Sequence, residues 1–350
     1  MDKQKKQPLL LLSLFVPLGI LRMQCVDASS NGVNKLFVFG DSYADSGNLN
    51  KSTYSSWKPP YGITYPGYPS GRFSNGRILV DYIATYYGIP SPVAYEERES
   101  GTTEYGVNFA FGGAGVFKTL FPVPNITGQI DLLQQLIDDK QTPYSQTDLL
   151  TSLAVVFVSG DDYIYYAVSH AGSLQGLAAY ANSVINQLVL DLKRIHDLGV
   201  PNVLVSGLGP LGCLPPATAD SSYTSCNSQV NGFPLFHNQL LFKSLEKLNF
   251  QSMEPVFFLL DLYDAFLAAI QGHVHLPDGG ILEFENRLKP CCQGVDAFNF
   301  CGDTVGGQPM YTVCPDPQSY FFWDVFHPTQ QGWYGAYLVI QPFLPQFTET

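Results

Sequence analysis

The sequence is poor in charged side chains, and in positive ones above all. Only 14% of its 350 residues are charged, with 18 Lys and Arg against 30 Asp and Glu, so the formal net charge is −12. Such a field repels phosphate backbones, which argues against nucleic acid as a partner. With 45% hydrophobic residues, the chain can still bury a sizeable core, and its length alone allows one large domain or two small ones.

Long apolar runs are equally scarce. The apolar stretch 9–21 follows a lysine-rich head and precedes small residues at 26–28, so we predict a secretory signal at 1–28 that is removed. A short membrane anchor is the alternative, but this run is too short to span a bilayer comfortably. No other stretch approaches that length, so we expect a secreted protein without stable membrane insertion. Glycosylation sequons at Asn50 and Asn125 are compatible with this route.

Cysteine is sparse but evenly numbered. Of seven cysteines, Cys25 leaves with the signal, and an even remainder in an oxidising compartment predicts disulfides. The clustering suggests one local bridge and two bridges within the C-terminal group, whose connectivity the sequence leaves open. The local pair is Cys213 and Cys226; the C-terminal group is Cys291, Cys292, Cys301 and Cys314.

No internal repeat and no linker-like segment divides the chain, so we expect one domain over residues 29–350. Short β-rich runs alternate with longer segments of helical spacing, which predicts an α/β fold with a parallel sheet covered on both faces. Ligands of such sheets lie beyond the carboxyl ends of the strands, where Ser42, Asp161 and the Gly207 loop emerge. The expected strands are 35–39, 153–158, 203–205 and 256–260; the expected helices are 77–87, 174–198 and 229–250.

A serine follows the first predicted strand on a Gly-Asp turn. In the sequence Phe37-Val38-Phe39-Gly40-Asp41-Ser42, such a turn can hold the Ser42 hydroxyl exposed above the sheet edge, as a nucleophile requires. The same residue types also make ordinary turns. The interpretation therefore depends on finding a base.

His327 supplies the candidate base. Among six histidines, only His327 has an acid three positions before it, Asp324. An activated serine needs a histidine, and the histidine needs a carboxylate that holds its tautomer. A buried histidine among aromatic residues is the alternative for His327. Together with the Ser42 turn, the pair predicts a Ser–His–Asp triad.

Three glycine- or histidine-rich segments invite other interpretations. The segment 108–115 can bring backbone close to a ligand, and we expect the Gly112 N–H to face an oxyanion; no Gly-Lys-Ser/Thr follows, which excludes a phosphate loop. The segment 207–212 matches a dinucleotide pattern, but Pro215 and its neighbours cannot open the helix that would hold a pyrophosphate. His273 and His275 near Asp278 lack two further convincing metal ligands.

Taken together, these motifs resemble the GDSL esterase/lipase family, the plant-type branch of the SGNH hydrolases, over nearly the whole mature chain. The matching segments are 40–48, 69–77, 108–115, 210–215 and 324–327. The resemblance implies a three-layer α/β/α, flavodoxin-like fold and no metal or organic cofactor. It also implies Ser42, Asp324 and His327 as catalytic residues, with the N–H groups of Ser42 and Gly112 at the oxyanion.

One position departs from the family pattern. The third block of the family reads Gly-x-Asn-Asp, and its Asn donates to the oxyanion; here the stretch is Ser159-Gly160-Asp161-Asp162. Asp161 thus occupies the Asn position, and an ionised carboxylate offers acceptors but no donor.

The sequence therefore predicts a monomeric carboxylic-ester hydrolase that acts on a small-molecule or lipid ester through a Ser42 acyl-enzyme. Two alternatives stay open. Acyl transfer to another alcohol uses the same residues and differs in excluding water. The Asp161 substitution is also compatible with a non-catalytic binder of an acylated sugar or lipid.

Overall fold

The computed structural model describes residues 32–139 and 144–345. The predicted signal, residues 1–28, lies outside them. Within this part of the chain, no helix has the length and apolar character that a membrane crossing requires.

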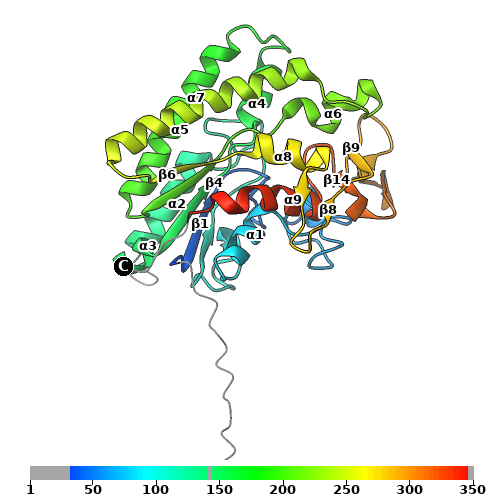
Figure 1. Cartoon of the computed structure of the whole chain (residues 1–350). Coiled ribbons are helices and arrows are strands. Elements are labelled where there is room, and N and C mark those ends of the chain that lie inside the picture. Colours follow the sequence, from blue (N-terminus) through cyan, green and yellow to red (C-terminus); the bar gives the residue numbers. More distant parts are fainter. Residues whose placement is uncertain (1–31, 140–143, 346–350) are drawn as a thin grey trace, which may run out of the picture.

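A six-stranded parallel sheet forms the centre of the molecule (Figure 1). Strands in its interior are buried on both faces, as parallel strands with helical crossovers are; every residue of β4 is buried, for example. The strand order is β2-β3-β1-β4-β5-β6. The bounds are β1 Lys35–Phe39, β2 Val93–Ala94, β3 Gly106–Asn108, β4 Ser152–Val156, β5 Asn202–Ser206 and β6 Phe257–Leu260.

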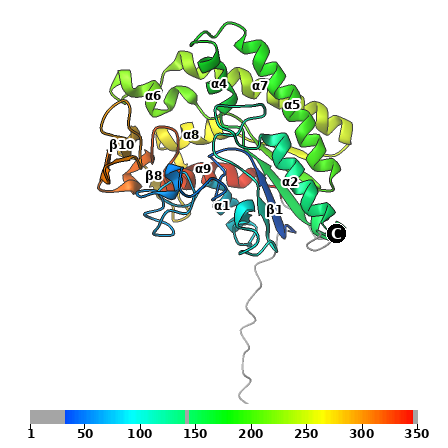
Figure 2. The same ribbon diagram turned by 180° about the vertical axis from the view of Figure 1, so that it is seen from behind.

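Side chains alternate between the two faces of the sheet and divide the core in two. Leu36 and Val38 of β1 pack with one set of helices, whereas Phe37 and Phe39 pack with the other. The first set is α1 (Leu79–Tyr86), α8 (Leu262–Gln271) and α9 (Gln330–Ile340). The second set is α2 (Ile126–Asp138), α5 (Leu177–Asp197) and α7 (Ser228–Ser252), of which α2 and α5 lie on the near side in Figure 2. The fold is therefore the expected three-layer α/β/α arrangement.

Shorter helices connect these elements. Helix α4 (Asp161–Ser169) follows the carboxyl end of β4, α3 (Gln146–Leu150) precedes the amino end of the same strand, and α6 (Pro215–Thr218) lies between β5 and α7. Short 3-10 helices span Ser55–Trp57, Tyr95–Glu97, Leu211–Cys213, Ala219–Ser221, Pro317–Ser319 and Gln341–Phe343.

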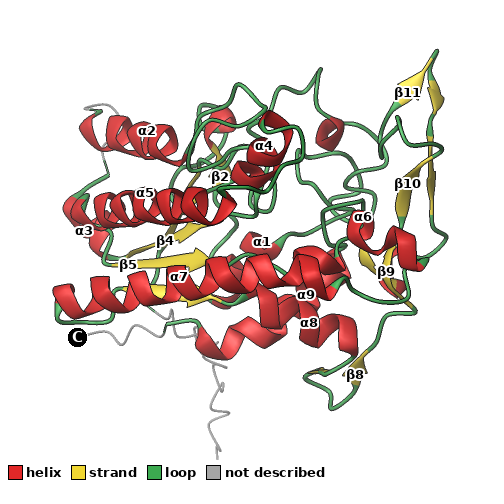
Figure 3. Cartoon of the chain, turned by 90° about the horizontal axis from the view of Figure 1, so that it is seen from above, coloured by secondary structure: helices red, strands yellow, loops and turns green. Residues whose placement is uncertain are grey.

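The C-terminal third adds small two-stranded sheets at one side of the molecule, where β9, β10 and β11 lie together in Figure 3. The pairs are β7 (Val274–His275) with β8 (Ile281–Leu282), β9 (Asn286–Pro290) with β14 (Tyr320–Phe322), β10 (Cys292–Gly294) with β13 (Tyr311–Val313), and β11 (Thr304–Val305) with β12 (Gln308–Pro309). Disulfides Cys291–Cys314 and Cys292–Cys301 bind this region together, and Cys213–Cys226 closes the predicted local loop. The predicted disulfides are thus confirmed, and the open connectivity is resolved.

The four predicted strands correspond to β1, β4, β5 and β6, and the three predicted helices to α1, α5 and α7. Strands β2 and β3 were not predicted. They have two and three residues, too few for the alternation of apolar and polar residues to register. The first residue of the predicted 108–115 loop accordingly belongs to β3.

Candidate active site

The nucleophile turn begins directly after β1, at Gly40. Its backbone has φ +137°, and a Cβ there would lie 2.6 Å from the Phe157 carbonyl oxygen, so only glycine fits. The buried Gln129 amide accepts from Gly40 N at 2.7 Å and donates to Gly40 O at 2.9 Å. The Asp41 carboxylate accepts from Tyr43 N and, at 2.6 Å, from Ser159 N. The Gln129 side chain of α2 and a backbone N–H of the β4–α4 turn thus fix the segment that carries Ser42.

The loop between β14 and α9 carries the other two predicted catalytic residues. Asp324 Oδ1 accepts the backbone N–H groups of Phe326 and His327, at 2.8 and 2.9 Å. This turn points the His327 ring back over its own acid, because the two residues are three apart and share one hydrogen-bonded bend. Thr329 then caps α9 by accepting from Gly332 N.

Ser42, His327 and Asp324 form one hydrogen-bonded chain. His327 Nε2 lies 2.8 Å from Ser42 Oγ, and His327 Nδ1 lies 2.8 and 2.9 Å from the two Asp324 oxygens. Ser42 and His327 are thus in contact although they lie 285 positions apart in the sequence. They suit transfer of the serine proton to Nε2, with the carboxylate holding the proton on Nδ1.

Asp324 remains ionised in this setting. Burial alone would raise the pKa of its carboxyl, but the His327 ring and three hydrogen bonds, including one from the Tyr61 hydroxyl, lower that pKa below its ordinary value. For Asp41 the balance is reversed. Burial outweighs the hydrogen bonds from the Ser159 and Tyr43 N–H groups, and the pKa of Asp41 is raised.

Gly112 lies next to the turn, but its N–H is already used. It donates at 2.8 Å to Asp45 Oδ2, while Asp45 Oδ1 accepts from Gly47 and Asn48 N–H. In the described structure, the Asp45 carboxylate thus holds the N–H that we expected to face the oxyanion. Burial raises the pKa of Asp45 to about 6, so the carboxylate is ionised at neutral pH.

Asn48 and Asn108 lock the first and second motif blocks together. The Asn48 amide donates to the Asn108 and Ala110 carbonyls, and the Asn108 amide donates to Ala44 O and Ser46 Oγ. Sequence reasoning marked both asparagines as motif residues without giving them a role. The signal that the sequence offered was the place of these two polar residues inside the motif segments 40–48 and 108–115.

Asp161 begins α4 at the carboxyl end of β4, the strand next to β1. Its backbone follows Ser159 by two positions, and the Ser159 N–H bonds to Asp41, so the third motif block adjoins the Ser42 turn as predicted. Burial first, then the charges of Asp41 and Asp162, raise the pKa of Asp161 well above its ordinary value. The neighbouring Asp162 accepts from Val116 and Phe117 N–H, and burial raises its pKa to about 6.

The two competing motifs have structural explanations. The loop after Gly207 is held by the Asn238 amide, which bonds to Leu208 N and O, and it continues into a 3-10 turn and the four-residue α6 instead of a long helix. His273, His275 and Asp278 do not come together, and the described residues contain no cluster of three or more His, Cys, Asp or Glu side chains able to hold a metal ion.

The two sequons differ in their surroundings. Asn50 is exposed, and its Oδ1 accepts from Ser52. Asn125 is half-buried and caps α2: its Oδ1 accepts from Gly128 N and its Nδ2 donates to Val116 O. The nitrogen that a glycan would use is therefore engaged at Asn125.

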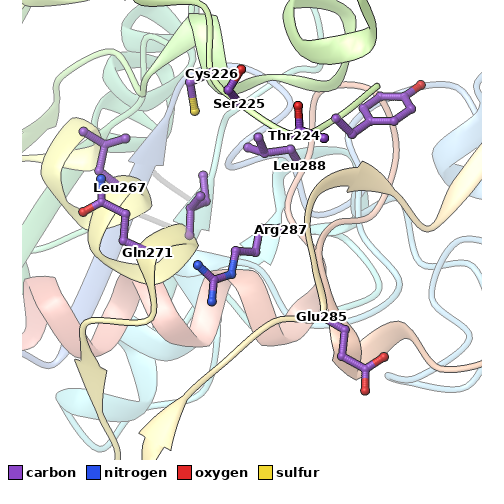
Figure 4. Close-up of a pocket in the computed structure, with 10 residues that line it drawn as sticks. Thr224, Ser225, Cys226, Leu267, Gln271, Glu285, Arg287 and Leu288 are labelled. Atoms are coloured by element: carbon purple, nitrogen blue, oxygen red, sulfur yellow. The ribbon is translucent and has the colours of Figure 1, made fainter. Parts of the chain in front are cut away.

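A pocket of about 270 Å³ lies between α8, β9 and the loop that carries Cys226 (Figure 4). Its walls include Leu267, Leu288 and Arg287, but neither Ser42 nor His327 nor Asp324 lines it. It is separate from the hydrogen-bonded chain described above.

An α/β/α fold with a serine, a histidine and an acid in one hydrogen-bonded chain at the end of the sheet defines a class, the α/β serine hydrolases. Within that class, residues 36–333 match the family model described as GDSL-like Lipase/Acylhydrolase. Two Arabidopsis thaliana proteins named GDSL esterase/lipase are each 43% identical to this chain, over 89% of it and 88% and 86% of their own lengths. Acetylajmalan esterase 2 of Rauvolfia serpentina is 28% identical over 85% of this chain and 86% of its own. The chain belongs to the GDSL lipase/acylhydrolase family and is a carboxylic ester hydrolase.

Proposed function

We propose that the protein hydrolyses its ester through an acyl-enzyme on Ser42. The observation that supports this most directly is the chain of 2.8 Å contacts from Ser42 Oγ through His327 to Asp324. Ser42 Oγ attacks the ester carbonyl carbon while His327 Nε2 takes the hydroxyl proton. His327 returns that proton to the leaving alcohol, and water, activated by the same ring, then releases the acid.

The developing oxyanion needs donors close to Ser42. The Ser42 backbone N–H is the first, because the turn presents it beside the hydroxyl. Since Asp45 holds the Gly112 N–H, we assign the second donation to the Asp161 carboxyl in its protonated form. The raised pKa of Asp161 supports this, because burial and the charges of Asp41 and Asp162 favour the proton.

We propose further that the protein is secreted as a monomer whose single domain covers residues 29–350. Three disulfides support an oxidising compartment, and the sequence at 1–28 has the pattern of a signal. Of the two sequons, the exposed Asn50 suits a glycan better than Asn125.

The test compares the secreted wild type with Ser42→Ala. A fluorophosphonate probe should label the wild type and leave Ser42→Ala unlabelled, and ester hydrolysis should fall by several orders of magnitude in the variant. Ser100→Ala, a change at an exposed loop serine, is the matched control and should behave as wild type.

The same experiment separates the alternatives. A binder without an activated serine would leave the wild type unlabelled as well. An acyltransferase would be labelled, but would form new esters when alcohol acceptors are supplied. The substrate panel should vary acyl chain length and include phenolic esters, acetylated sugars and other acetyl esters, since one relative is named as an acetylajmalan esterase.

A further inference from the structure

The segment between the nucleophile turn and α1 has been given no step in the mechanism above, although it contains the family-like stretch Gly71-Arg72-Phe73-Ser74-Asn75-Gly76-Arg77, called the signature below. In the fold, the blue and cyan loops of this segment lie against the orange and red C-terminal elements (Figures 1 and 2). The hydrogen bonds between them converge on the loop that carries Asp324 and His327. We call Tyr61, Phe73, Ser74 and Asn75 the clamp.

Tyr61 makes the most direct contact of the clamp. Its hydroxyl donates to Asp324 Oδ2 at 2.8 Å, and its side chain is buried. Its ring meets Trp323 edge-on, with centroids 6.1 Å apart. Burial and the Asp324 charge raise the pKa of Tyr61 well above its ordinary value. The hydroxyl therefore stays a donor over any practical assay range.

Phe73 covers the base itself. Its ring stacks on the His327 imidazole at 4.9 Å and 30°, and its other neighbours include Tyr61, 6.2 Å away, and the Gly112 loop. The imidazole cannot rotate about its long axis without displacing this ring. Phe73 thus limits the ring to the orientation in which Nε2 faces Ser42.

Ser74 and Asn75 hold the backbone beyond His327. Ser74 Oγ donates to Pro328 O at 3.1 Å, and Asn75 Oδ1 accepts from Gln330 N at 2.7 Å. The Gln330 side chain in turn accepts from Arg77 N at 3.0 Å. Side chains of the signature thus bond to the end of the catalytic loop and the start of α9, and a side chain of α9 bonds back to the signature.

We propose that Tyr61 is a positioning residue of the triad, which orients the Asp324 carboxylate and sets how strongly that carboxylate stabilises protonated His327. This inference rests on the proposed triad mechanism. The hydroxyl places the positive end of its dipole against Asp324. Removing it makes the potential at His327 more negative, so protonation of the ring becomes more favourable.

Other charged and titratable groups surround the pair, and they stay in place in the variants below. Burial and the charges of nearby acids, including Asp324, raise the pKa of Tyr43 above its ordinary value. The groups are Asp41 and Tyr43 on the nucleophile turn, and Asp303, which faces Tyr61 from the disulfide-bonded region.

Tyr61→Phe tests the proposal, with aryl-ester hydrolysis followed from pH 4 to 9. We expect kcat to fall about tenfold, as for loss of one hydrogen bond to a charged group, with KM little changed. The acid limb of kcat/KM should move to higher pH, which a merely loosened fold would not produce. Tyr311→Phe is the matched control: it also removes a tyrosine hydroxyl bonded to this segment, at Pro59 O, 3.0 Å away, but it leaves Asp324 untouched and should keep the wild-type profile.

A second variant guards against a folding defect in Tyr61→Phe. Fluorotyrosine incorporated at position 61 keeps the hydroxyl but makes it a stronger donor, so the acid limb should move to lower pH. Unchanged pH profiles in both variants, with a wild type that labels with fluorophosphonate, would overturn the role of Tyr61. A wild type that fails to label would instead overturn the triad mechanism itself.

Discussion

Asp161→Asn is the substitution with the sharpest expected outcome. We expect Asp161 to occupy the position of the family's oxyanion-donating Asn, and burial, Asp41 and Asp162 raise its pKa well above the ordinary value. Below that pKa the carboxyl is neutral and can donate. As the pH rises through it, the donor is lost and a negative charge appears beside the developing oxyanion.

Both consequences of ionisation are large. Two unit charges about 4 Å apart repel by roughly 4 kcal/mol at an effective dielectric of about 20. Loss of one oxyanion donor costs on the order of 10²–10³ in rate. An Asn at this position donates at every pH. The ratio of Asp161→Asn to wild-type activity should therefore be near one in acid and increase with pH, reaching at least tenfold at neutral to alkaline pH, about 1.4 kcal/mol of barrier.

The assay is aryl-ester hydrolysis from pH 4 to 9 for the wild type, Asp161→Asn and Asp264→Asn. Asp264 is an exposed acid on α8, so the control removes one surface carboxylate and should leave the profile unchanged. If the activity ratio for Asp161→Asn is flat with pH, or below one throughout, then Asp161 does not serve the oxyanion.

Three further outcomes follow from the structure. Burial raises the pKa of Asp191 to about 6, and its Oδ2 has no partner among the described residues. The stability that the protonated carboxyl contributes is complete below about pH 4 and is lost as the pH rises through about 6. Asp191→Asn should therefore raise the free energy of unfolding by about 2 kcal/mol at pH 8 and hardly at pH 4, as urea melts can measure. Titration of the denatured, unreduced secreted protein should find no free thiol, and two or more per chain would contradict the three disulfides. Glycosidase treatment should lower the mass of the wild type and of Asn125→Gln but not of Asn50→Gln, because Asn125 Nδ2 is bonded to Val116 O; a glycan confined to Asn125 would reverse the assignment.

The sequence predicted best those parts of the fold that depend on local periodicity. Residues 35–39 form β1 as expected, and α5 and α7 begin and end within three residues of their predicted bounds. Burial on both faces gives such strands a continuous apolar run, and a long amphipathic helix repeats its signal over several turns. Strands β2 and β3 are too short to repeat any pattern of apolar residues. They are strands because they pair with the sheet, β3 with β1 and β2 with β3.

The candidate site was predictable where chemistry limits the residue type. A serine nucleophile, a base and an acid leave few choices among six histidines, so Ser42, Asp324 and His327 could be paired without coordinates. By contrast, many residue types can accept a hydrogen bond from a backbone N–H, so chemistry does not single out its partner. Nothing in the sequence indicates that Asp45 takes the Gly112 N–H, nor that the Tyr61 hydroxyl reaches an acid 263 positions away.

The origin of each part of the site explains this difference. Ser42, the Gly112 loop and Asp161 follow β1, β3 and β4, which are neighbours in the sheet, so strand order alone brings them together. The Asp324–His327 loop leaves β14, outside that sheet, so strand order in the central sheet does not place it. Its position depends instead on side-chain bonds to Tyr61, Ser74 and Asn75, together with the Tyr43 hydroxyl, which donates to Phe326 O at 3.1 Å. Substitutions after the central strands should accordingly act on the nucleophile and oxyanion, whereas substitutions in the clamp should act on the base.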